Sequence, residues 1–182
     1  MKKKIVIGVG VFILIIVVGF LYLNYRNRNL SPPGVVKYDK NDFIIEIPYS
    51  RPSKKGRLIF GTKEDGALLP YGVYWRLGAN EATQVTFNRN VLFNGTSVSA
   101  GTYRMYAVPG EYQFEITLNT ELGNWGAFEP NHDLDILKTT VPVEKSNESV
   151  EQFTIRFEEE SPAVLIVCAW SDVKIKIPVE PN

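Results

Sequence analysis

The sequence predicts an all-β domain, an antiparallel and jelly-roll-like β-sandwich of about ten strands, preceded by one N-terminal transmembrane helix. An uncharged apolar run from Ile5 to Leu23 predicts the helix. Most later segments alternate between apolar and polar residues with period two, which is typical of half-buried strands. A continuously apolar run over residues 164–170 indicates a central strand buried on both faces. The chain beyond the helix is long enough to bury one hydrophobic core.

The apolar run has the length and flanks of a membrane anchor. At ~1.5 Å per residue it extends ~28 Å, which matches the hydrocarbon core of a bilayer. It is longer than the apolar part of a cleaved signal peptide, and no small-x-small cleavage site follows it. Lys2, Lys3 and Lys4 outweigh Arg26 and Arg28, so the positive-inside rule places Met1 in the cytoplasm. We therefore expect an uncleaved, single-pass signal anchor in the cytoplasmic membrane, with the domain facing the periplasm or the cell exterior.

These features divide the chain into three parts. Residues 1–25 form the cytoplasmic tip and the transmembrane helix. Residues 26–40 are polar and contain Ser31-Pro32-Pro33-Gly34, which predicts a linker. Residues 41–182 form the extracytoplasmic β-sandwich. Within it, Asn94-Gly95 links Val91-Leu92-Phe93 to Thr96-Ser97-Val98 and predicts a tight hairpin.

Charge and cysteine content exclude several classes of protein. The chain has 20 basic and 20 acidic residues. Five basic residues flank the apolar run and no acid precedes Asp39, so the rest carries fifteen basic and twenty acidic residues, a net charge of −5. A negative domain is poorly suited to nucleic acid, whose phosphates dominate affinity. Cys168 is the single cysteine, so no intrachain disulfide forms, and its apolar neighbours predict a small buried side chain.

Two polar segments interrupt the alternating strands, and the first is a cationic loop over residues 49–57. It carries Arg51, Lys54, Lys55 and Arg57 together with a proline and a glycine. Such a loop is suited to a carboxylate or phosphate, because arginine offers paired donors to these groups. The alternative is a solvated turn whose cations pair with neighbouring acids.

The second polar segment covers residues 70–83. It brings Tyr71, Trp75, Arg76, Asn80 and Glu81 close together in the sequence, and aromatic faces beside planar polar groups favour a sugar or peptide ligand. The alternative is a structural ion pair between Arg76 and Glu81, with the aromatic rings in the core. We expect these two side chains to interact, directly or through Asn80.

Six segments of the chain carry a resemblance to a known family. They are R-P-S-K-K-G-R-L-I-F-G (51–61), P-Y-G-V-Y-W-R-L-G-A-N-E-A-T (70–83), A-G-T-Y-R-M-Y-A-V-P-G (100–110), N-W-G-A-F (124–128), E-Q-F-T-I-R-F (151–157) and W-S-D-V-K-I-K-I-P (170–178). Together they resemble the bacterial domain-of-unknown-function family numbered 2911, over roughly residues 31–179. The resemblance implies an exported protein of Bacteroidetes-like bacteria in a periplasmic or surface setting. It implies no activity and assigns no catalytic residue.

No catalytic or metal motif is evident. His132 is the only histidine, and no nucleophile motif lies near it. Zinc-ligand spacing is absent. The alternating polar residues 129–135 lack the glycine and the distal glutamate of a calcium loop. We therefore expect no metal and no cofactor.

The sequence predicts a membrane-anchored, extracytoplasmic binding or interaction module of the bacterial envelope that is not an enzyme. Its partners are the membrane, through the helix, and a glycan or peptide ligand; nucleic acid is excluded. The candidate ligand-binding residues are Arg51, Lys54, Arg57, Tyr71, Trp75, Arg76, Asn80 and Glu81. The alternative is an envelope hydrolase that acts on glycan or peptide with Glu81 as the acid.

Overall fold

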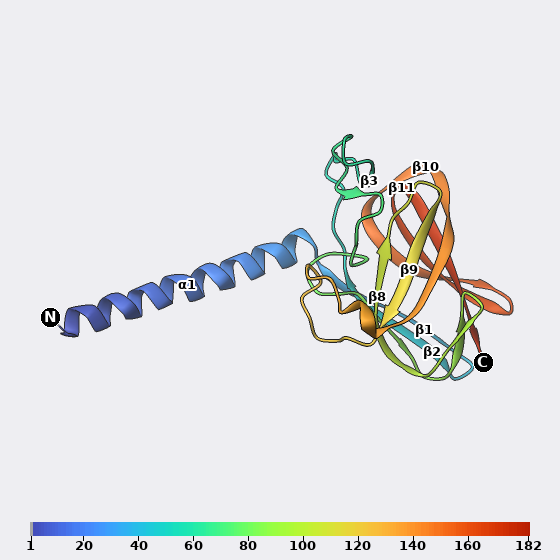
Figure 1. Ribbon diagram of the computed structural model, residues 1–182, viewed down its shortest axis with the longest axis horizontal. Helices are drawn as coiled ribbons and strands as arrows, with labels where there is room; N and C mark the ends of the chain where they lie inside the picture. The colour runs from blue at the N-terminus through green and yellow to red at the C-terminus, as the bar shows by residue number, and fades with distance from the viewer. Residues whose placement is uncertain (1) are drawn as a thin grey trace.

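The computed structural model describes residues 2–182, and side chains from residue 7 onward. A single helix, α1 (Lys2–Leu30), projects from a compact β domain (Figure 1). Its described apolar side chains are exposed, and its length and composition suit a membrane span. A helix of this kind near an N-terminus either anchors a protein in a membrane or serves as a signal sequence.

The domain is a mainly antiparallel sandwich, as predicted. The main sheet has the order β1-β2-β5-β8-β9-β10-β11-β6-β7. Its strands are β1 (Pro33–Lys40), β2 (Phe43–Ser50), β5 (Gln84–Phe87), β6 (Val91–Phe93), β7 (Thr96–Val98), β8 (Gly101–Val108), β9 (Gln113–Asn119), β10 (Asp135–Glu160) and β11 (Ala163–Pro181). A short parallel pair, β3 (Phe60–Gly61) and β4 (Leu69–Pro70), stands apart from it, and a 3-10 turn (His132–Leu134) precedes β10.

The long strand β10 joins the two layers. Its first part, residues 135–142, pairs with β9, and the rest pairs with β11. The register of the β10–β11 pair shifts between Lys145 and Val150 and again between Val150 and Thr154. Such irregularities bend and twist a strand locally. The change of partner from β9 to β11 precedes them, between Pro142 and Val143.

One hydrophobic core fills the space between the layers. It includes Ile45 and Ile47 of β2, Met105 of β8 and Ile166 of β11, all fully buried. Residues 164–170 are buried throughout, which confirms the prediction of a doubly covered strand. Buried Cys168 lies in this run, and burial raises the pKa of its thiol to about 12.

The segment predicted as a linker, residues 26–40, has regular structure instead. α1 continues through Leu30, and β1 occupies Pro33–Lys40 and pairs with β2 along its whole length. The turn between β1 and β2 consists of Asn41 and Asp42, which both have positive φ. Asn and Asp tolerate this conformation and favour two-residue hairpins. The sequence pattern missed β1 because this edge strand is polar and carries a proline and a glycine.

The predicted hairpin at Asn94-Gly95 is confirmed. It connects β6 and β7, which pair in antiparallel register, and both turn residues have positive φ.

Candidate functional site

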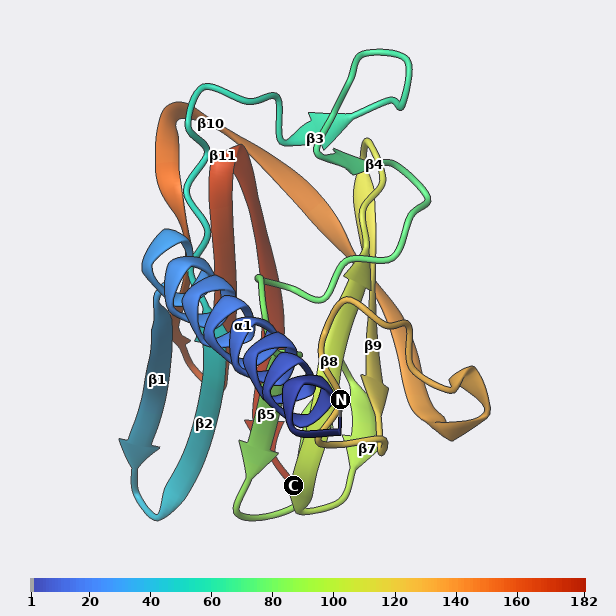
Figure 2. The ribbon, with the colours of Figure 1, turned by 90° about the vertical axis from the view of Figure 1, so that its left-hand side faces the viewer.

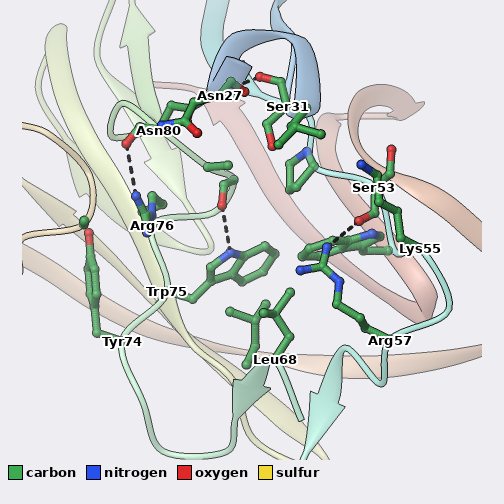
Figure 3. Close-up of a pocket in the computed structure, with 17 residues that line it drawn as sticks. Asn27, Ser31, Ser53, Lys55, Arg57, Leu68, Tyr74, Trp75, Arg76 and Asn80 are labelled. Atoms are coloured by element: carbon green, nitrogen blue, oxygen red, sulfur yellow. Dashed lines mark hydrogen bonds between the residues drawn. The ribbon is translucent and has the colours of Figure 1, made fainter. Parts of the chain in front are cut away.

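A pocket of about 670 Å³ lies where the end of α1 meets the domain (Figure 3). Asn27, Leu30 and Ser31 form its wall on the side of α1. The two polar segments singled out in the sequence form much of the remainder, through residues 52–57 and 74–80. The pocket therefore needs both the domain and the last turns of the helix.

The charged side chains of the pocket are all basic. Lys55, Arg57 and Arg76 line it, and no aspartate or glutamate is among its described lining residues. Arg57 is held by its own loop: its Nη2 donates to the carbonyl oxygen of Ser53 at 2.6 Å, and its Nε donates to that of Lys54 at 3.0 Å. The pocket is thus positively charged although the domain as a whole is acidic.

Arg76 is a half-buried cation without an acidic partner. Its Nη1 donates to the carbonyl oxygen of Asn80 at 3.1 Å, and it forms no ion pair with any described residue. Burial lowers the pKa of its guanidinium, and the nearby cation Arg104 lowers it further, against the opposing effect of Tyr74. An anion in the pocket would offset this unfavourable electrostatic environment.

Two tryptophans form an apolar part of the wall. Trp75 and Trp170 stack with 6.0 Å between ring centroids and an interplanar angle of 24°. The indole N–H of Trp75 donates to the carbonyl oxygen of Gly78 at 3.3 Å. Both residues belong to the aromatic core, so the core itself supplies this surface.

Gly78 is required where residues 74–80 pack against β2. Its φ is +151°, and a Cβ there would lie 2.8 Å from the carbonyl oxygen of Ser50. Only glycine fits this backbone conformation and this close approach without strain.

Asn80 connects three parts of the site. Its side-chain amide donates to the carbonyl oxygens of Asn27 and Ser31, at 3.4 and 3.2 Å. Its own carbonyl accepts from Arg76 and from the backbone N–H of Gly126. Asn80 therefore holds α1, the pocket arginine and the loop of residues 120–131 together.

A buried arginine fixes that loop on the outer face of the sheet. Arg104 of β8 is almost fully buried, and its Nη2 donates to the hydroxyl of Tyr74 and the carbonyl oxygen of Phe128. The Tyr74 hydroxyl in turn donates to the carbonyl oxygen of Gly126 at 3.0 Å. The Nε and Nη1 groups of Arg104 have no hydrogen-bond partner among the described residues.

The structure brings half of the predicted site residues to the pocket. Arg57, Trp75, Arg76 and Asn80 line it. The other four, Arg51, Lys54, Tyr71 and Glu81, do not.

These four residues have other contacts. The Nζ of Lys54 donates to the hydroxyl of Ser149, and Tyr71 packs against the core. The Nη2 of Arg51 lies 3.5 Å from the carbonyl oxygen of Pro33. Glu81 lines a second pocket, of about 540 Å³, and pairs with Arg28 of α1. We predicted that Arg76 and Glu81 interact directly or through Asn80. No direct contact forms, because Glu81 pairs with Arg28, and Arg76 donates to the backbone carbonyl oxygen of Asn80.

Sequence reasoning missed the contribution of Asn27, Ser31, Trp170 and Arg104. Trp170 lies far from residues 70–83 in the sequence, and Asn27 and Ser31 were placed in a linker. For Arg104 the sequence did offer a signal, a cation within the alternating segment Tyr103–Ala107. The structure buries this arginine on a covered face of β8, where a cation is unusual.

A second polar cluster surrounds His132. The Tyr106 hydroxyl lies 2.9 Å from both carboxylate oxygens of Asp135 and 3.0 Å from Nδ1 of His132. Asn119 also donates to Asp135, at 2.7 Å. The cluster ties residues 120–134 to β8 and β9. Within the described part of the chain, no group of three or more His, Cys, Asp or Glu side chains is placed to hold a metal ion.

Fold and site together define a β-sandwich with a basic, aromatic-lined pocket at the junction with an apolar helix. The family model described as "Protein of unknown function (DUF2911)" matches residues 31–179. The chain belongs to this family, which confirms the resemblance. No curated protein matches the chain. No solved structure matches it.

Proposed function

We propose that this protein is a membrane-anchored, extracytoplasmic binding module of the bacterial envelope, whose pocket binds a glycan or peptide that carries a carboxylate or phosphate group. The observation that carries the proposal is the set of three pocket cations, Lys55, Arg57 and Arg76, with no described acid lining the same pocket. Guanidinium groups bind carboxylates and phosphates through paired hydrogen bonds.

The aromatic residues support a ligand with an apolar or ring-shaped part. Tyr74, Trp75 and Trp170 line the pocket beside the cations. Ligand pockets commonly combine aromatic surface with a few polar groups that fix orientation, and a volume of about 670 Å³ lies within their usual range.

The geometry offers less support for the hydrolase alternative. Glycoside hydrolysis needs two carboxyl groups that flank the scissile bond. Glu81, the candidate acid, lines a different pocket and pairs with Arg28. We therefore propose binding without catalysis.

The position of the domain outside the cytoplasm is supported by charge. Three lysines precede the apolar run and two arginines follow it, which favours a cytoplasmic N-terminus. Protease treatment of spheroplasts tests this topology. Digestion of the domain is expected, and a domain protected until the membrane is lysed would contradict the proposal.

Binding is tested with the full chain in lipid nanodiscs, because α1 forms part of the pocket. Muramyl peptides and sugar phosphates are titrated by calorimetry against the wild type, Arg76→Gln and Arg57→Gln. Lys63→Gln is the matched control, since Lys63 is an exposed cation outside the pocket. We expect weaker binding for the two pocket variants and unchanged binding for the control. Failure of the wild type to bind any of these probes, or equal affinities in all four proteins, would contradict the proposal.

A further inference from the structure

The loop of residues 120–131 lies on the side of the domain from which α1 emerges (Figures 1 and 2). It exposes large apolar side chains. Phe128 is 70% exposed and Trp125 is 38% exposed, and Leu122 of the same loop is also exposed. Single exposed apolar residues are normal on a protein surface. Three in one short loop beside a membrane-spanning helix require an explanation.

The backbone of this loop is fixed to the domain, so its aromatic side chains are not exposed by disorder. The N–H of Gly126 donates to Asn80 at 3.1 Å, and its carbonyl accepts from Tyr74 at 3.0 Å. The carbonyl of Phe128 accepts from Arg104. Gly126 is so closely packed that a Cβ would lie 2.7 Å from Cδ of Arg76. Three backbone polar groups of the loop are thus bonded to the domain, while the side chain of Phe128 is largely exposed and that of Trp125 is partly exposed.

The loop is also linked to the end of α1. Trp125 forms an isolated antiparallel bridge with Glu81, and Glu81 pairs with Arg28 in the last turn of the helix. Trp125 is therefore connected to α1 through a single intervening residue, Glu81.

This link sets the distance of the loop from a membrane. Arg28 is five residues beyond Leu23, the end of the apolar run, which corresponds to ~8 Å along the helix. The headgroup layer of a bilayer is ~5–8 Å deep on each side. Trp125 therefore lies near the level of the headgroups when α1 spans the membrane.

We propose that residues 122–128 form a second membrane contact, in which Trp125 and Phe128 enter the interfacial layer of the same bilayer that α1 spans. This inference rests on the membrane anchoring in the proposed function. Tryptophan and tyrosine favour this layer because one end of the side chain is apolar and the other polar. Tyr22 and Tyr25, exposed at the same end of α1, belong to the same aromatic belt.

The short distance to the anchor favours the bilayer over a protein as the occupant of this surface. A partner would have to enter the narrow space between the domain and the headgroups. The contact also has a consequence for the pocket. Ala127 of the loop and Asn27 of α1 both line it. Two membrane attachments on either side would fix the orientation of the pocket relative to the bilayer.

The tryptophans of this chain permit a direct test. Trp75 and Trp170 are 4% and 2% exposed, so Trp125 is the accessible one. The full chain is reconstituted into phosphatidylcholine vesicles, and membrane insertion is checked by flotation and by resistance to alkaline extraction. Fluorescence is then quenched with phosphatidylcholine brominated near the headgroup and, separately, with acrylamide in the water phase.

We expect brominated lipid to quench a component of the emission that is absent in Trp125→Phe and diminished in Phe128→Ser. Acrylamide is expected to quench this component weakly. An inserted protein whose Trp125 is quenched by acrylamide and not by brominated lipid would overturn the membrane contact and leave the anchoring intact. Quenching of Trp125 by neither reagent would show that protein, such as a second copy of this chain, covers the loop, and would also overturn it. Failure of the wild type to float with the vesicles would contradict the anchoring itself.

Discussion

Arg28, in the last turn of α1, forms an ion pair with Glu81, which follows the segment that lines the pocket. Their side chains are 48% and 44% exposed, so water competes with the pair. Exposed ion pairs contribute little to stability. This pair nevertheless joins the end of α1 to the segment that follows the pocket-lining residues. Its role is to position the helix on the domain beside the hydrogen bonds of Asn80 to Asn27 and Ser31.

Glu81→Gln is therefore expected to change the free energy of unfolding of the domain by less than about 1 kcal/mol, because exposed pairs have this magnitude. Thermal denaturation of the full chain in nanodiscs measures the change. Arg28→Gln should have a similar effect, and the double variant should differ little from either single variant. A loss of several kcal/mol would instead indicate a buried charge left without its partner.

Gly78→Ala tests the close contact beneath the pocket. The new Cβ would lie 2.8 Å from the carbonyl oxygen of Ser50, and φ is +151°. We expect a loss of about 2–4 kcal/mol of unfolding free energy, from overpacking together with backbone strain.

Gly66→Ala is the matched control for Gly78→Ala. Gly66 also has positive φ, but a Cβ there meets nothing within 4 Å. Gly66→Ala should therefore lose only about 1 kcal/mol of unfolding free energy, from backbone strain alone. Equal melting temperatures for the two variants would contradict the proposed clash with β2.

The alternating pattern was sufficient to predict a β-sandwich, because strands such as β2 and β9 bury one face and alternate apolar with polar residues. It failed for β1, an edge strand with an exposed face and a polar sequence. The two-residue turn at Asn41 and Asp42 was the local signal for β1. It was overlooked because the preceding Ser-Pro-Pro-Gly segment indicated a linker.

Only part of the candidate site was predicted, because the sequence shows local clusters of residues but not contacts between distant segments. Residues 74–80 were recognised because aromatic and polar groups cluster in the sequence. The partner of Glu81 was not, because Arg28 is 53 residues away and spacing cannot show a tertiary contact. Glu81 lies next to Asn80 but lines the second pocket, so two adjacent residues line different pockets.

Arg104→Met tests whether the buried guanidinium holds the loop of residues 120–131. The substitution keeps much of the volume but removes the donor to Phe128 and Tyr74. We expect faster hydrogen exchange of the Gly126 amide, which depends on the position of the loop. Stability should fall by about 1–3 kcal/mol, because buried acceptors lose a partner.

Arg89→Met is the control for Arg104→Met. Arg89 is exposed and donates to the carbonyl oxygen of Asp42, which is not part of the loop of residues 120–131. In Arg89→Met, the rate of hydrogen exchange of the Gly126 amide should match that of the wild type. Unchanged exchange in Arg104→Met would show that other contacts hold the loop.

The cluster at Asp135 predicts a pH dependence of stability. Burial alone would raise the pKa of the Asp135 carboxyl, but hydrogen bonds from Asn119, Tyr106 and His132, together with nearby Lys138, outweigh burial and hold the pKa below its ordinary value of 3.8. In the unfolded chain these contacts are lost and the carboxyl takes up a proton more readily. Stability from this group is therefore fully present above about pH 5 and decreases as the pH falls through 4 and below.

Asp135→Asn should remove this component. Chemical denaturation between pH 2.5 and 7, compared for wild type and variant, is expected to show the larger difference in unfolding free energy at neutral pH and a shrinking difference below pH 4. Glu144 and Asp172 also have lowered pKa values, because hydrogen bonds from lysines outweigh the opposing effect of burial. They affect both proteins equally, so the difference between the two curves isolates Asp135. A difference that stays constant across this range would show that the carboxylate charge of Asp135 does not stabilise the attachment of the loop.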